Sequence, residues 1–265
     1  MVKPYEIGMG VRMIARAVSS QAKVNSLTEA LIRKTLTKAN ITPQDLCDLL
    51  NPFLPQDQAS RSPLTISNNY GVQVIHNLTG LHFCVTNGHC AQVLTLPNSP
   101  ARPQFKGFIG SAYEGRRNTL NPLKAEPWDI RSLRPQDHYP NFDKLLGLDL
   151  SLLKRIESQL PELDMASDGE ADDEALVPLG PPKYRAWFAP HYLSAIIKAT
   201  DVMAQLLGSP QGDSSDTEIL MDQGLNPIAV FKANQGLQTF FLASIDVSIA
   251  AKQERSVTKA KGAKA

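Results

Sequence analysis

The chain has 265 residues and a formal net charge of +1, with 42% hydrophobic and 20% charged residues. This composition excludes a disordered chain and allows one large domain or two ordinary ones. A net charge near zero gives no argument for a nucleic-acid or membrane partner, so any such argument must come from local clusters.

The cysteines and the apolar runs indicate the compartment. Cys47, Cys84 and Cys90 are too few for a disulfide framework, which favours a reducing environment. No apolar run approaches the roughly 18 residues of a membrane span. Residues 1–20 carry basic side chains within their apolar stretch, unlike a secretory signal. We expect a cytoplasmic protein without membrane contact.

Two helices are predicted in the N-terminal part of the chain. In residues 26–39, Ser26 and Glu29 have the spacing of a capping box. The next helix begins with Thr42 as N-cap and Pro43 in its first turn, where a proline is well tolerated. Its predicted buried stripe is formed by Leu46, Leu49 and Leu50.

Residues 61–96 are typical of consecutive strands. "SPLTISN" and "YGVQVIHNL" precede "LHFCVTNGHCAQVLTL" at 81–96, where Asn87 and Gly88 indicate a type I′ hairpin because both accept a positive φ. The alternation predicts a half-buried strand over 81–86. Its two faces carry Leu81, Phe83 and Val85, and His82, Cys84 and Thr86.

Residues 97–140 are rich in proline and hard to assign to regular structure. A structureless connection of this length is unusual inside a domain. We therefore expect short strands within it, at "QFKGFIGSAY" (104–113).

The C-terminal part alternates helices and strands without a strict order. "LDLSLLKRIESQL" predicts an amphipathic helix over 148–160, and 162–175 is an acidic run expected to be a solvated loop. "KYRAWFA" (183–189) predicts a strand, and a long helix follows from Pro190 to Gly208. Two final strands, "GLNPIAVFKA" and "LQTFFLASIDVSIA", flank a turn at 234–236, and a basic tail over 252–265 is expected to be disordered.

Helices that do not alternate strictly with strands favour an α+β fold with antiparallel sheets over a parallel doubly wound fold.

The sequence contains no convincing enzyme site. A Gly-rich phosphate loop, G-x-S-x-G and H-E-x-x-H are all missing. Ligand-type side chains gather in the hairpin, but a second module with metal-ligand spacing is missing too, so we favour a packed hairpin over a metal site. Those side chains are His82, Cys84, His89 and Cys90. On a strand, His89 would point away from Cys90, which argues against a Cys nucleophile. We expect no cofactor and no bound metal.

Several stretches resemble the bacterial DNA polymerase sliding clamp, the β subunit. "VTNGHCAQ" (85–92) is similar to the T-D-G-H-R-L-A hairpin of that family, and the stretch leading to it is similar in order and spacing. "HYPNFDKLLG" (138–147) resembles the F-P-D-Y-R-R-V-L segment, and "FAPHYLSAIIKA" (188–199) the F-N-x-x-Y-L-x-x-x-L-x-A helix. "NPIAVFKANQGLQTFFLASIDV" resembles the two closing strands.

The resemblance implies DNA-clamp-like β-α-β-β-β units, with clamp-like domains at 41–140 and 141–250. Residues 1–40 would be an N-terminal helical extension and 251–265 the tail. It also implies a pocket between two domains that accepts a short linear motif from DNA polymerase or another replication protein. The residues that would line this pocket are Thr86, Gly88 and His89; Pro140, Lys144 and Leu145; and Ala243, Ser244 and Ile245.

The resemblance implies a non-enzymatic, homo-oligomeric accessory protein of DNA replication or repair. A gene on a mobile element is an added part of this hypothesis. DNA contact is expected from Lys154, Arg155, Lys198, Lys259 and Lys261. Two alternatives remain open: a structural or interaction protein of a phage or mobile element with an unrelated α+β fold, and a nuclease or other enzyme. An acidic cleft, or one lined by His82 and Cys84, would favour the enzyme.

Overall fold

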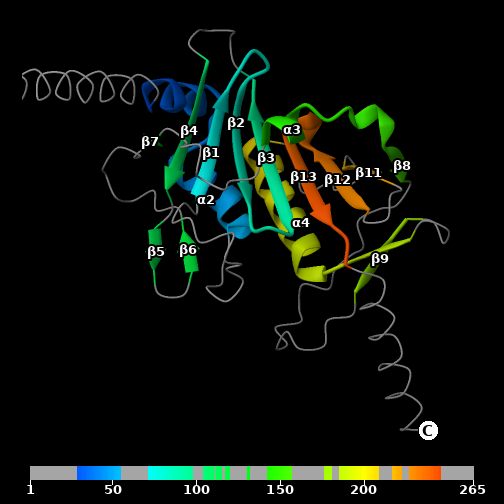
Figure 1. Cartoon of the computed structure of the whole chain (residues 1–265). Coiled ribbons are helices and arrows are strands. Elements are labelled where there is room, and N and C mark those ends of the chain that lie inside the picture. Colours follow the sequence, from blue (N-terminus) through cyan, green and yellow to red (C-terminus); the bar gives the residue numbers. More distant parts are fainter. Residues whose placement is uncertain are drawn as a thin grey trace, which may run out of the picture.

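A computed structural model describes most of the predicted elements (Figure 1). The described residues are 29–54, 71–97, 104–110, 112–114, 117–119, 130–131, 142–156, 176–180, 185–208, 217–222 and 227–245. The predicted cap at Ser26, the strand at 62–68, the acidic run at 162–175 and the tail lie outside them.

Within the described residues, nine strands form one sheet in which every pair of neighbours is antiparallel. The α+β class with antiparallel sheets is confirmed. In spatial order the strands are β7 (Ile130–Arg131), β4 (Phe105–Gly110), β1 (Gly71–His76), β2 (Leu81–Thr86), β3 (Cys90–Leu96), β13 (Gln238–Ala243), β12 (Ile228–Ala233), β11 (Glu218–Met221) and β8 (Lys154–Ile156). Two small ribbons lie beside this sheet: β9 (Val177–Leu179) with β10 (Ala186–Phe188), and β5 (Ala112–Glu114) with β6 (Arg117–Thr119).

The centre of the sheet joins strands from the two halves of the chain. β3 pairs with β13, with Cys90 opposite Leu242 and Leu94 opposite Gln238. The strands on one side of this pair come from 71–131, and those on the other side come from 154–243.

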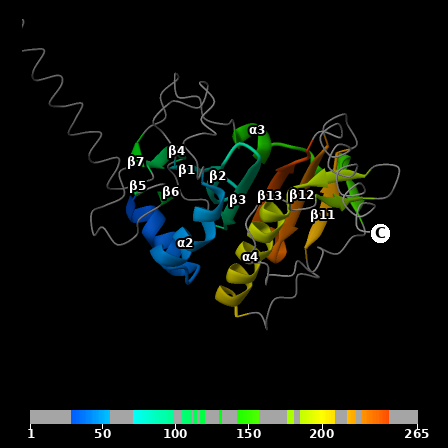
Figure 2. The ribbon, with the colours of Figure 1, turned by 90° about the horizontal axis from the view of Figure 1, so that it is seen from below.

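Within the described ranges, three helices cover one face of the sheet, which we call the helix face. They are helix 29–38, α2 (Pro43–Leu50) and α4 (Pro190–Leu206) (Figure 2). Their apolar side chains form one core with alternate residues of the strands, such as Phe83 and Phe240. The largest side chains of this core are completely buried, as expected of a stable fold.

The start of α2 was predicted correctly down to its cap. The Thr42 hydroxyl accepts from the Asp45 N–H at 3.1 Å, and the Asp45 carboxylate accepts from the Thr42 N–H at 2.8 Å. This reciprocal pair satisfies two backbone donors that a helix start leaves without intrahelical partners. The predicted stripe of three leucines is buried.

The opposite face of the sheet is covered by the segment that begins with α3 (Phe142–Leu146), so we call it the α3 face (Figure 2). The alternation along β2 is as predicted, with Phe83 on the helix face and Cys84 on the α3 face. The prediction of a half-buried strand is wrong, because His82 is 3% exposed and Cys84 0%. Both faces of this antiparallel sheet are covered.

The predicted helix over 148–160 is also wrong. Leu150–Leu152 forms one 3-10 turn, and the chain continues directly into the strand β8. Leu152, an apolar residue of that stretch, is 82% exposed. The Asp149 side chain accepts from the Ser151 N–H at 3.1 Å, a local bond that competes with helix formation, and the pairing of β8 with β11 buries Ile156 instead.

Other predictions are confirmed in type and position. The hairpin strands, β1, β10, α4, β12 and β13 lie within their predicted stretches, and Gly208, just past α4, has φ 71°. The Pro-rich region contains β4 and β5 where short strands were expected. The short strands β6, β7, β9 and β11 were not predicted.

Candidate functional site

The hairpin turn between β2 and β3 is stabilised by side-chain hydrogen bonds. The Asn87 carbonyl oxygen Oδ1 accepts from the N–H groups of His89 at 3.0 Å and Cys90 at 2.8 Å. The Thr86 hydroxyl donates to the Cys90 carbonyl at 2.9 Å and accepts from the Gly88 N–H at 3.0 Å. Among residues 86–90 only Gly88 has a positive φ, 94°, so the predicted type I′ turn is wrong. Asn87 acts through its side chain, as in an Asx turn.

This turn lies next to the end of β13. The Ala243 N–H donates to the His89 carbonyl at 3.0 Å. Two residues on, the Ile245 N–H donates to the Trp187 carbonyl of β10 at 2.8 Å. Two of the three segments that the resemblance brings together, 86–89 and 243–245, are therefore hydrogen-bonded to each other, and β10 extends the same region.

Aromatic rings gather at the same place. The exposed His89 ring stacks on Tyr192 of α4, with 5.9 Å between ring centroids and 25° between planes. His191 contacts the same ring, with centroids 4.0 Å apart. Burial, and secondarily the Cys90 thiol, raise the pKa of Tyr192. The position of Tyr192 makes the start of α4 part of this region, which the sequence analysis did not include.

The third predicted segment lies on the α3 face. Lys144 is exposed on α3, and Leu145 is half-buried against a cluster that includes Ala91 and Phe241. By strand alternation Thr86 and Ala243 belong to this same face. Pro140 lies outside the described residues.

The ligand-type side chains of the hairpin do not converge. His82 and Cys84 lie on the α3 face, Cys90 faces the helices, and His89 is exposed at the turn. Among the residues that the structure describes, no three His, Cys, Asp or Glu side chains are grouped so that they could hold a metal ion. Both ring nitrogens of His82 are hydrogen-bonded. Nδ1 lies 3.0 Å from the Thr95 hydroxyl, and Nε2 lies 3.0 Å from the Asn77 side-chain oxygen.

The cysteines are buried thiols. Burial raises the pKa of Cys47 to about 12 and raises those of Cys84 and Cys90 well above the usual range. A thiol in this state carries almost no thiolate at neutral pH, so none of the three is suited to nucleophilic catalysis.

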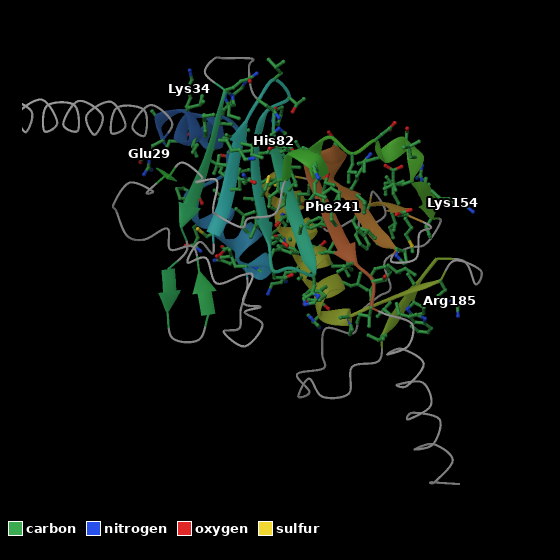
Figure 3. All side chains as sticks on the ribbon, in the orientation of Figure 1. Glu29, Lys34, His82, Lys154, Arg185 and Phe241 are labelled. Atoms are coloured by element: carbon green, nitrogen blue, oxygen red, sulfur yellow. The ribbon has the colours of Figure 1, made fainter. Side chains whose placement is uncertain are left out.

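The basic side chains predicted to contact DNA lie on separate elements. Lys154 and Arg155 are exposed on the edge strand β8, and Lys198 is exposed on α4. Figure 3 shows Lys154 at one end of the molecule and Lys34, an exposed lysine of helix 29–38, at the other. Lys259 and Lys261 lie outside the described residues. Across the described part of the chain, no helix is long and apolar enough to span a bilayer.

No protein-family model matches the sequence, and a search of curated proteins finds no relative. Among solved structures, the chain is similar to the DNA polymerase sliding clamp of Bacillus subtilis, at 10% identity and a TM-score of 0.42 over 80% of this chain and 63% of the clamp. It is also similar to the Helicobacter pylori beta clamp, at 12% identity and 0.42 over 78% and 63%. The Thermotoga maritima DNA polymerase III beta subunit gives 10% identity and 0.38 over 78% and 63%. The chain spans less than two thirds of the length of these clamps, and within that span its structure is similar to bacterial DNA polymerase sliding clamps.

Proposed function

We propose that this protein is a non-enzymatic, clamp-like accessory factor of DNA replication or repair, which docks partner proteins through a short linear motif. The division into clamp-like domains at residue 140 belongs to the same proposal. The docking surface is formed by the hairpin turn 86–89, the end of β13 at 243–245 and the start of α4.

One observation carries the proposal: the Ala243-to-His89 hydrogen bond joins two of the segments that the sequence resemblance assigns to one site. Around this bond, side chains are apolar or aromatic and incompletely buried. Ile228, opposite Ala243 on β12, is 41% exposed, and Trp187, Tyr192 and Ile245 are half-buried. Partly exposed groups of this kind are the usual anchors of peptide binding, because a partner's Leu or Phe buries area against them.

Lys144 and Leu145 extend the proposed surface onto the α3 face. Leu145 is half-buried in the cluster that contains Ala91, the residue paired with Thr86 across the hairpin. This arrangement supports a surface that continues from the turn towards α3.

Replacing Ile245 by Asp is expected to weaken peptide binding at least tenfold, about 1.4 kcal/mol, because a charge would be desolvated under the bound peptide. The probe is a set of short peptides, each carrying a Leu and a Phe, that a displayed random library enriches on the intact protein. Affinities are measured by fluorescence anisotropy, and folding by circular-dichroism melts.

The matched control is Leu78→Asp, at a side chain that is 75% exposed in the turn between β1 and β2. His89→Ala, at an exposed position, gives a second test if Ile245→Asp unfolds the protein. Failure to enrich any peptide, or equal losses from Leu78→Asp and Ile245→Asp, would contradict the docking proposal and favour an unrelated interaction protein.

DNA contact is the second part of the proposal, and we expect it to depend on Lys154 and Arg155. Removing one phosphate contact lowers the slope of log affinity against log salt by about 0.9. The Lys154→Ala, Arg155→Ala double variant should therefore show a smaller slope than the wild type with a labelled duplex. Lys198→Ala and truncation after Ala251 should each lower it further.

Arg185→Ala, at an exposed arginine outside the assigned set, serves as the control for a general loss of charge. Light scattering with and without the duplex should give a mass above that of one chain, because a homo-oligomer is part of the same proposal. If none of these variants changes the slope of log affinity against log salt, the substituted residues do not bind DNA.

A further inference from the structure

Among the described residues, the segment that covers the α3 face is 142–156, which we call the strap. A buried cluster on this face combines Phe142 of the strap with side chains from six strands. Among the described residues, every partly buried side chain packed against the cluster comes from the strap. These side chains are Leu145, Leu146, Leu150 and Leu153.

The strap is a thin cover. Apart from Phe142 and Ile156 its side chains are half-buried at most, and Leu148 and Leu152 are 49% and 82% exposed. The ion pair between Lys106 of β4 and Asp143 of the strap, at 2.6 Å, joins two exposed side chains, so screening by water makes it weak. The helix face, by contrast, is covered by three helices, of which α4 alone has 17 residues.

The strap ends in an edge strand. Its last three residues form β8, which pairs with β11 and is the last strand of the described sheet (Figure 1). Release of the strap therefore breaks the pairing of an edge strand and no pairing inside the sheet. Segments with few buried contacts and exposed hydrogen bonds open at lower free energy than the core.

Cys84 lies beneath the strap and can report its opening. Its side chain is 0% exposed on the α3 face, while Cys47 and Cys90 belong to the core on the helix face. Burial raises the pKa of Cys84, and Asp143 and Lys106 are close enough to act on it as well. The ion pair at the start of the strap therefore lies near this thiol.

We propose that the strap opens as a unit while the rest of the fold remains intact. Opening uncovers the α3 face and frees the edge of β11. It also displaces Lys144 and Leu145, so it would regulate the docking surface, a consequence that depends on the proposed function. The opening itself does not depend on that function.

The test is alkylation of the native, full-length protein by iodoacetamide, with each cysteine followed by peptide mass spectrometry. Cys84 should react faster than Cys47 and Cys90, with a weaker dependence on urea, because a local opening exposes less surface than global unfolding. Leu153→Ala, in the strap, should speed Cys84 labelling roughly tenfold and leave the other two rates within about twofold.

Leu206→Ala is the matched control, since Leu206 is a half-buried leucine packed on the helix face. It should not increase the ratio of the Cys84 rate to the Cys90 rate. Equal rates and equal urea dependence for all three thiols would show that only global unfolding exposes Cys84, and would overturn the proposal. Faster Cys84 labelling without any peptide binding would leave the strap proposal standing and remove the docking function.

Discussion

Replacing Gln92 by Met is expected to raise the free energy of unfolding by about 1–2 kcal/mol, because it removes a buried amide that has no partner. Gln92 is 0% exposed in the central strand β3, and within the described residues neither its Oε1 nor its Nε2 has a hydrogen-bond partner. Its strand neighbour across the β3–β13 pair is Phe240, in the core of the helix face. Met has nearly the same shape as Gln and requires no partner.

The same substitution at Gln238 should have the opposite sign. Gln238 is also 0% exposed and on the helix face, but its amide is satisfied. Its Nε2 donates to the Ala199 carbonyl of α4 at 3.0 Å, and its Oε1 accepts from Asn234 at 2.6 Å. Gln238→Met breaks both bonds and should lower the free energy of unfolding by about 1–3 kcal/mol.

Urea melts of the two variants and the wild type measure both changes. Because residue type, burial and substitution are matched, the comparison isolates the hydrogen bonds. A loss of stability in Gln92→Met as large as that in Gln238→Met would mean that the Gln92 amide is satisfied, for example by buried water.

Stability should also fall steeply between pH 6.5 and pH 4 because of His82. Burial, with a smaller effect of nearby His76, lowers the pKa of His82 from 6.5 to about 4. In this window the unfolded chain binds a proton that the folded protein does not, so acid favours unfolding. The loss reaches about 3 kcal/mol at pH 4 and stops below it, a large part of the typical 5–15 kcal/mol of a domain.

The comparison variant is His82→Gln, which removes the titrating group and keeps an amide that can bond to Asn77 and Thr95. The difference in unfolding free energy between wild type and variant should change with pH between 6.5 and 4 and be constant above 7. His191→Gln, at an exposed position, is the control. An NMR titration that places the pKa of His82 near 6.5 would refute the prediction directly.

Local signals in the sequence predicted the elements whose stability is local. The cap of α2 needs only Thr42, Pro43 and Asp45, of which Thr42 and Pro43 were predicted in these roles. The hairpin was predicted by its alternation, although Asn87 contributes its side chain rather than a positive φ. Features that depend on distant contacts were predicted less well.

Two such features are instructive. The leucines of 148–153 have helical spacing, but Leu150 and Leu153 pack on the α3 face while β8 pairs with β11, and this tertiary pairing overrides local propensity. Burial of both sides of β2 follows from the strap, which no pattern within 81–86 encodes. For the candidate site, the resemblance identified the turn and the end of β13, whereas Tyr192 became part of it only through the position of α4.

The pairing of β3 with β13 has a consequence for synthesis on the ribosome. When the hairpin has emerged, the strand that pairs with the outer edge of β3 has not yet been made, because it lies at 238–243. At ~5–20 residues per second, that edge waits on the order of ten seconds. An apolar strand with open hydrogen-bonding groups is a site of aggregation. The nascent first half of the chain therefore carries an aggregation-prone edge until β13 pairs with it.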